Sequence, residues 1–163
     1  GETLCYFYKI KRGVDICIFR PFNVFWPGMP RNDYRVFPRF FSSIKDKKPI
    51  TIFKNGKQTR TFCYVTDAIT AMFIVTLVGK NFVYNIGNNK PELNMNKLHE
   101  IMQIALKKKI KSTNISYPKN YPQVEPQRRC PDISKLLKEF NYRNNVNIKE
   151  AIVRFYYWTS KYY

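Results

Sequence analysis

The stretch Val14-Asp15-Ile16-Cys17-Ile18-Phe19-Arg20, followed by Pro21-Phe22-Asn23, decides the fold class of this 163-residue chain. Residues 14–20 are rich in β-branched and aromatic side chains, which predicts a buried strand. Three prolines and one glycine follow within residues 21–30, so the strand runs into a loop. A strand of this kind is typical of α/β proteins, whose ligands bind beyond the carboxyl ends of strands.

Helical and strand patterns alternate around this strand, which predicts one α/β unit without internal repeats. Asn94, Asp132 and Asn147 are expected to cap helices. We expect helices at residues 2–11, 37–44, 67–78, 95–108 and 132–140 and from residue 147 onward. Strands or extended segments are expected at residues 50–53, 60–65, 82–86 and 113–117, and a proline-rich loop at residues 118–131.

The chain carries 29 Lys and Arg against 11 Asp and Glu, a formal net charge of +18. Hydrophobic residues make up 44% and aromatic residues 17%, which argues against disorder. A basic, aromatic-rich domain could bind nucleic acid. The lysines, however, are scattered or sit in short runs such as residues 107–109, which is typical of a solvated face. The charge alone therefore does not select a function.

Several kinds of chemistry lack their residues in this sequence. The six glycines never approach the spacing of a phosphate-binding loop. The four cysteines lie far apart, which excludes paired zinc or redox spacing and favours a reduced, cytoplasmic setting. His99 is the only histidine and falls within a helical pattern, which argues against histidine-based catalysis and a metal site.

Arginines and amides beside aromatic residues remain as a candidate binding site. Arginine suits a diphosphate because its planar fork donates two hydrogen bonds to neighbouring oxygens. Phe53 is a candidate ring for stacking a base. The polar candidates are Asn23, Arg35, Gln58, Arg60, Arg128 and Arg129.

Four segments, in order, resemble signatures of the NAD-dependent epimerase/dehydratase family, the extended short-chain dehydrogenases/reductases that act on nucleotide sugars. They are residues 20–29 (RPFNVFWPGM), 50–67 (ITIFKNGKQTRTFCYVTD), 84–88 (YNIGN) and 125–135 (EPQRRCPDISK). The second and fourth segments give the likeness to UDP-glucuronate decarboxylases (UDP-xylose synthases) and related sugar epimerases.

The resemblance implies a division of labour. Residues 1–24 would end the Rossmann part, and residues 25–163 would mainly form the nucleotide-sugar-binding lobe. The NAD-binding half and its catalytic Tyr-x-x-x-Lys pair would precede this chain, which alone is expected to be inactive. Tyr157 and Lys161 share that spacing by chance, on the last helix. The intact enzyme would oxidise C4 of the sugar with NAD, and decarboxylation, dehydration or epimerisation would follow.

The resemblance also implies roles for individual residues. Asn23 would contact phosphate, Arg35 would lie near substrate and cofactor, and Arg60 would hold the diphosphate or lie near a sugar carboxylate. Thr51 and Phe53 would lie around the base. Gln58 belongs to the Gln-Thr-Arg signature, and Arg128 or Arg129 would be the second phosphate-binding arginine.

Two departures and the open alternatives complete the expectations. Trp26 stands where the family has glycine, which puts the loop geometry in question. Asn141 also stands at a family glycine, but this change is milder because asparagine tolerates the left-handed conformation at the end of a helix. The ligand would be a UDP-sugar, with a homodimer formed through the tyrosine-bearing helix and residues 2–11 as its tail. The alternatives are a non-catalytic nucleotide-sugar binder and a basic nucleic-acid binder.

Overall fold

The computed structural model describes residues 1–118 and 126–163. Its helices are α1 (Glu2–Arg12), α2 (Val36–Lys45), α3 (Val65–Val78), α4 (Met95–Leu106), α5 (Ser134–Phe140) and α6 (Ile148–Tyr162). Its strands are β1 (Ile18–Pro21), β2 (Val24–Phe25), β3 (Ile50–Phe53), β4 (Thr59–Arg60), β5 (Cys63–Tyr64), β6 (Val83–Ile86), β7 (Leu93–Asn94), β8 (Ser112–Ile115) and β9 (Arg128–Arg129).

The sheets are short and mostly parallel. β1 pairs with β6, β2 with β5 and β3 with β8, each pair parallel and separated in sequence by at least one helix. A further sheet has the order β7-β4-β9. This alternation of strands and helices confirms the expected α/β class.

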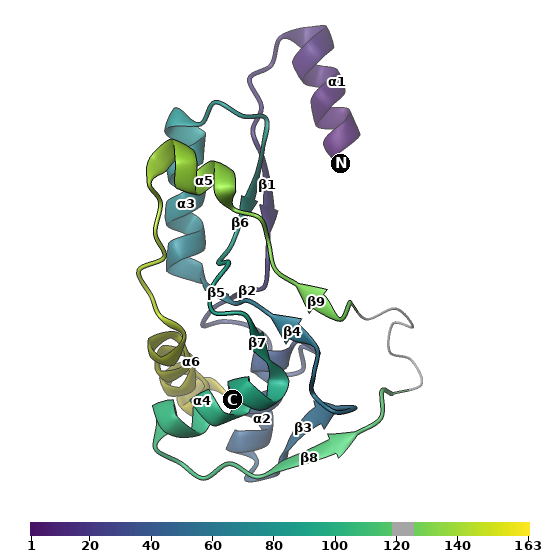
Figure 1. The fold of residues 1–163 in the computed structure, drawn as a ribbon, viewed down its shortest axis with the longest axis vertical. Coiled ribbons are helices and arrows are strands. Elements are labelled where there is room, and N and C mark those ends of the chain that lie inside the picture. Colours follow the sequence, from purple (N-terminus) through teal and green to yellow (C-terminus); the bar gives the residue numbers. More distant parts are fainter. Residues whose placement is uncertain (119–125) are drawn as a thin grey trace.

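Two groups of elements bury separate cores (Figure 1). In the strand-pair region, α3 and α5 lie beside β1 and β6. In the aromatic region, α2 packs against β3, α6 packs against α2 and α4, and β8 pairs with β3. The core of the strand-pair region comprises Cys63, Ala68, Ala71, Val75, Tyr84, Ile86, Ile133, Leu136 and Tyr142. The boundary after residue 24 stays a prediction, although α3, β6 and α5 lie with β1 in the structure.

Aromatic rings fill the core of the aromatic region. Phe25 stacks on Phe37 with ring centroids 3.8 Å apart, and the edge of Phe155 meets both rings at 6.0 Å. Phe41 meets Phe155 at 5.0 Å. Ring pairs of these geometries add to the free energy gained by burying their apolar area.

Local signals place the helices of the aromatic region. The Asn94 side chain accepts a hydrogen bond from the Lys97 amide at 2.8 Å, which confirms the expected cap of α4. Asn147 accepts one from the Glu150 amide at 3.0 Å and starts α6 in the same way. Pro38 is tolerated in α2 because the first-turn N–H groups of a helix have no intrahelical partner.

Three expectations about local structure were wrong. The strand expected at residues 14–20 begins only at Ile18 and is not buried, because β6 is its one neighbour among the described residues. The proline-rich segment contains β9, although residues 119–125 lie outside the described part of the chain. Ile133 occupies the cap position of α5, and Asp132 accepts the Ser134 amide from one residue earlier.

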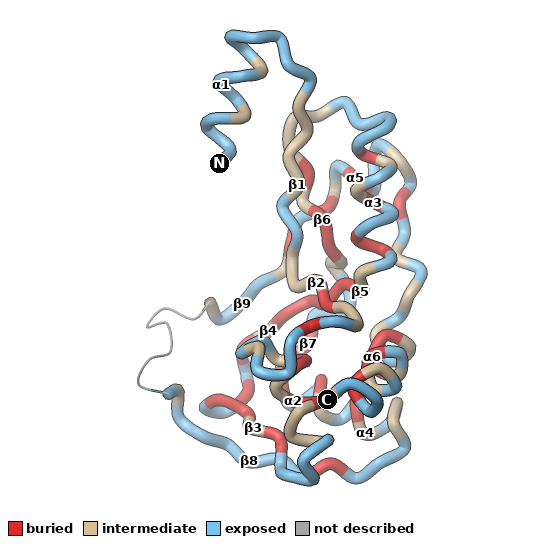
Figure 2. Tube along the Cα trace, turned by 180° about the vertical axis from the view of Figure 1, so that it is seen from behind, coloured by how far each residue is buried: buried red, intermediate tan, exposed pale blue. Residues whose placement is uncertain are grey.

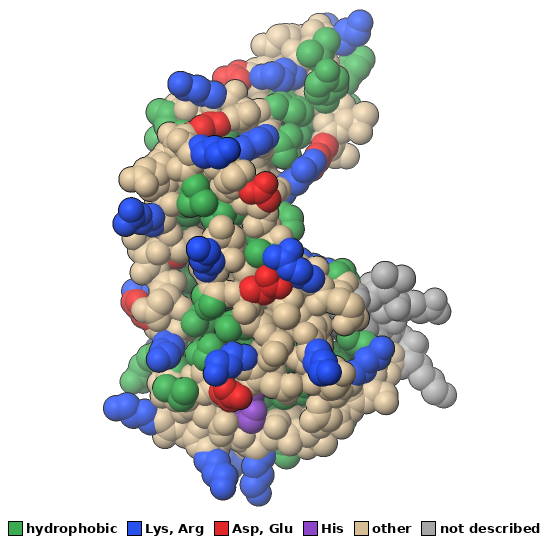
Figure 3. Space-filling model, viewed as in Figure 1, with side chains coloured by type: hydrophobic (Ala, Val, Ile, Leu, Met, Phe, Trp, Pro, Cys, Tyr) green, Lys and Arg blue, Asp and Glu red, His purple; other side chains and the backbone are tan. Residues whose placement is uncertain are grey.

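Helix α1 ends at Gly13 in the left-handed conformation, and none of its residues is buried. Leu4 is 60% and Ile10 is 62% exposed. Figures 1 and 2 show this helix standing apart from the rest of the chain, and Figure 3 shows the molecule hollowed beneath it. An ion pair between Glu2 and Arg20 links it to β1.

Within residues 1–118 and 126–163, no helix combines the length and apolar character needed to cross a membrane.

Candidate functional site

A cleft of about 300 Å³ opens between α2, β3 and the β4–β9 pair. Four arginines and no carboxylate are among its described lining residues, so the cleft favours an anionic ligand. The polar lining residues are Asn23, Tyr34, Arg35, Arg39, Gln58, Arg60 and Arg129. Phe25, Phe37, Phe53 and Phe62 are among its apolar lining residues.

The pairing of β4 with β9 brings two of the arginines to the same side. Thr59 lies opposite Arg128, and Arg60 lies opposite Arg129, in parallel register. Because successive side chains of a strand point to opposite faces, one face carries Thr59 and Arg128 while the other carries Arg60 and Arg129. The cleft is on the second face.

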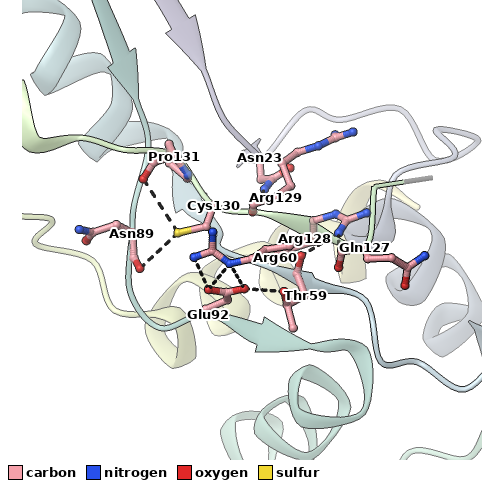
Figure 4. A network of polar contacts seen from close by, with 10 residues as sticks. All are labelled: Asn23, Thr59, Arg60, Asn89, Glu92, Gln127, Arg128, Arg129, Cys130 and Pro131. Carbon is pink, nitrogen blue, oxygen red and sulfur yellow. Dashed lines mark hydrogen bonds and ion pairs between the residues drawn. The ribbon is translucent and has the colours of Figure 1, made fainter. Parts of the chain in front are cut away.

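Arg128 is held on the other face by Glu92. Its Nε and Nη2 donate to the two carboxylate oxygens at 2.9–3.1 Å, and the Thr59 hydroxyl donates to the same carboxylate. Hydrogen bonds from Thr59 and then Arg128 hold the pKa of Glu92 below its usual value. Figure 4 shows Arg128 turned toward Glu92 and away from the direction taken by Arg129. Of the two candidate arginines, Arg129 is therefore the one in the cleft.

Arg60 and Asn23 are buried or half-buried and tied to the backbone. Arg60 is 7% exposed, and its Nη1 donates to the carbonyl of Thr59 at 2.7 Å. Asn23 has a φ of 46°, a left-handed conformation that asparagine tolerates. Its side-chain amide donates to the Thr61 carbonyl at 2.8 Å and lies 3.5 Å from that of Arg129. Asn23 thereby joins the end of β1 to β9 while lining the cleft.

Arg35 lies at the mouth of the cleft, and its guanidinium is engaged by Asp33. Arg35 Nε lies 3.0 Å from both carboxylate oxygens, and the hydrogen bonds from Arg35 lower the pKa of Asp33. Trp26, the departure from the family glycine, places its ring 5.0 Å from the guanidinium carbon. The tryptophan is thus accommodated as a neighbour of Arg35.

The other predicted residues divide in two. Gln58 and Phe53 line the cleft, whereas Thr51 does not. Thr51 lies two residues before Phe53 on β3, about 7 Å farther back along the strand, so it falls short of the cleft. Tyr157 and Lys161 lie on α6, and neither is among the lining residues.

Sequence reasoning missed Arg39 and Tyr34. Arg39 follows Arg35 by four residues, so both lie on one face of the start of α2. The available signal was the position of Arg39 within the largely aromatic residues 37–41. A charged side chain among buried rings must reach solvent or a polar cleft. Tyr34 is 76% exposed in a loop and carried no such signal.

Comparisons with known proteins identify relatives of this chain. The model of the NAD dependent epimerase/dehydratase family matches residues 1–87, more than half of the 163 residues.

The chain belongs to this family.

Two curated members illustrate the likeness. UDP-glucuronic acid decarboxylase 1 of Arabidopsis thaliana is 33% identical over 156 residues, covering 94% of this chain and 34% of the relative. UDP-glucuronate 4-epimerase of Thermodesulfobacterium geofontis (strain OPF15) is 32% identical, covering 99% of this chain and 48% of the relative. This chain therefore spans about a third to a half of the length of these relatives.

A solved structure of the same family gives a similar picture. UDP-glucuronic acid 4-epimerase from Bacillus cereus, in complex with UDP-glucuronic acid and NAD, is similar with a TM-score of 0.85 and 27% identity. The match covers 99% of this chain and 50% of the epimerase.

Proposed function

We propose that this chain binds the nucleotide diphosphate of a UDP-sugar within an NAD-dependent enzyme that decarboxylates or epimerises the sugar. The observation that carries the proposal is the cross-strand pair of Arg60 and Arg129 facing a cleft without a described carboxylate. Two guanidinium groups on the same face can donate charge-assisted hydrogen bonds to the oxygens of a diphosphate. The names of the relatives support a UDP-sugar, and both a lyase and an isomerase occur among them.

The family's cofactor is NAD, but the described residues do not include a glycine-rich dinucleotide-binding loop. Gly13 ends a helix, Gly56 lies in a turn and Gly79 follows a helix, so none of them brings backbone N–H groups to a pyrophosphate. We therefore assign this chain no step that uses NAD. Its residues would bind the ligand, fix its orientation and neutralise its charge.

Matched arginine variants test the proposal. UDP binding to the 163-residue chain is measured by calorimetry for the wild type, Arg129→Ala and Arg128→Ala. We expect Arg129→Ala to raise the dissociation constant about 10- to 100-fold, because charge-assisted hydrogen bonds are lost. Arg128→Ala should change it less than about threefold, since that guanidinium is bonded to Glu92 on the other face.

Two outcomes would contradict the proposal. Equal effects of the two variants would mean that general charge, and not the cleft, binds UDP. Salt-dependent binding of random-sequence DNA without UDP binding would favour the nucleic-acid alternative. Figure 3 favours a solvated basic surface over a nucleic-acid-binding surface, because Lys and Arg side chains are spread over the visible face and do not form a stripe.

The assembly and cellular setting are also proposals. A homodimer would cover the exposed apolar residues of α1, which lie on a helix without any buried residue. Ile10→Glu should then lower the mass measured by sedimentation from dimer to monomer, and a monomeric wild type would contradict this. All four cysteines are free, which supports a reducing, cytoplasmic location.

A further inference from the structure

Arg39 occupies a fixed position against two aromatic rings on the wall of the cleft. Its guanidinium carbon lies 3.9 Å from the centroid of the Phe53 ring, which is van der Waals distance, and 5.6 Å from that of Phe40. Phe40 is fully buried and Phe53 is 7% exposed. Two buried rings therefore contact the guanidinium.

Phe53 has little ring surface left to offer a ligand. Arg39 lies over the ring, and Tyr117 contacts it at a centroid distance of 5.1 Å and an angle of 52°. Arg39 itself lines the cleft. A ligand that approaches this wall therefore meets the guanidinium before it meets the phenylalanine ring.

The chemistry of a supported guanidinium suits a nucleobase. The group is planar, delocalised and weakly hydrated, and it stacks on aromatic faces. Nucleic-acid-binding proteins use arginine planes in the same way as aromatic rings to stack unpaired bases. Stacking requires a flat partner, whereas charge attraction to phosphate does not.

We propose that Arg39, backed by Phe53, is the stacking surface for the base of the bound nucleotide, an inference that rests on the proposed function. Arg60 and Arg129 then hold the diphosphate, and Arg39 holds the flat end of the same ligand. Phe53, the ring expected from the sequence to stack on the base, then acts indirectly, because it positions Arg39.

The test separates stacking from charge. The probes are UDP, 5,6-dihydro-UDP, whose base keeps its polar groups but is not flat, and pyrophosphate. In the wild type we expect UDP to bind about five- to tenfold more tightly than 5,6-dihydro-UDP. In Arg39→Lys this ratio should fall to about one, while pyrophosphate binding stays within about twofold, because lysine keeps the charge and loses the plane.

Arg31→Lys is the matched control. It makes the same change eight residues earlier, on a guanidinium that is bonded to Asp46 and does not line the cleft, and it should keep the wild-type ratio. Circular dichroism confirms that each variant is folded. A second measurement needs no variant: nuclear Overhauser effects between uracil H5 or H6 and the Arg39 side chain are expected in the wild-type complex.

The outcomes are distinguishable. An unchanged ratio in Arg39→Lys, a ratio of one in the wild type, or uracil contacts elsewhere would overturn the stacking role and leave diphosphate binding intact. Failure of the wild type to bind both UDP and pyrophosphate would overturn the proposed function, and the stacking role with it.

Discussion

The aromatic region and the strand-pair region use similar elements but close their cores differently. In the aromatic region, β3 is mostly buried and packs against α2, and rings such as Phe155 are fully enclosed. In the strand-pair region, α3 and α5 cover one side of β1 and β6, while β1 keeps exposed residues and α1 buries none. The difference predicts that the aromatic region carries more of the stability than the strand-pair region.

The largest effect is expected at the centre of the aromatic region. Phe155→Ala removes a ring that meets Phe25, Phe37 and Phe41, and should cost about 3–5 kcal/mol in the free energy of unfolding. Urea unfolding followed by fluorescence measures this. Tyr157→Ala, two residues later and 72% exposed, is the control and should change stability by less than about 0.5 kcal/mol. A cost near zero for Phe155→Ala would remove the basis of the comparison.

A smaller effect is expected in the other core. Leu136→Ala, at a side chain 1% exposed, should cost about 2–3 kcal/mol, because a region with an open side can relax into the space left. Hydrogen exchange should accelerate at β1 and β6 and stay unchanged at β3 and β8. Leu137→Ala is the exposed control. Uniform acceleration along the chain would mean that the two regions unfold as one.

The link between the regions should contribute less. Asp67, 4% exposed on α3, accepts the backbone amides of Asn145 and Val146 at 3.2 and 3.0 Å just before α6. Asp67→Asn should cost about 1–2 kcal/mol, because asparagine keeps one acceptor oxygen and places an NH2 donor against the other backbone amide. Thermal unfolding should also broaden. Asp15→Asn, at a fully exposed side chain, is the control, and an equal effect there would contradict the link.

The smallest perturbation is a labelling experiment that leaves stability untouched. Burial, and then the charge of Asp67, raise the pKa of Cys63 to about 12. At pH 8 only about one thiol in 10⁴ is then ionised in the folded state. Because the folded pKa is raised, the protonated thiol favours folding below the unfolded pKa, and this contribution is lost as pH rises toward 12. Maleimide should label Cys5 first, and Cys63 only when the strand-pair region opens. Equal rates would contradict that picture.

The sequence was sufficient where local signals determine structure. The caps at Asn94 and Asn147 need only a side chain and an amide three residues on, and α3 needs only its apolar content. The extent of β1 could not be read from its composition, since burial depends on neighbours. A two-residue strand such as β9 has no periodicity to detect.

Most of the predicted binding residues lie together, although their roles stay predictions. Arg60 and Arg129 line one cleft with Asn23, Gln58, Arg35 and Phe53. Which of the adjacent Arg128 and Arg129 faces the cleft depends on pairing with β4, which the sequence does not express. That Phe53 lies beneath Arg39 depends on how α2 packs on β3.

The brevity of β9 has a consequence for evolution of the cleft. Its alignment with β4 spans only Thr59–Arg128 and Arg60–Arg129, and Glu92 restrains it from one side. A slip of one position would turn Arg128 toward the cleft and Arg129 away from it. An insertion or deletion near β9 could therefore change which arginine faces the ligand, while the residue type in contact with the ligand stays arginine. Identical adjacent residues make such drift tolerable, because either can serve in place of the other.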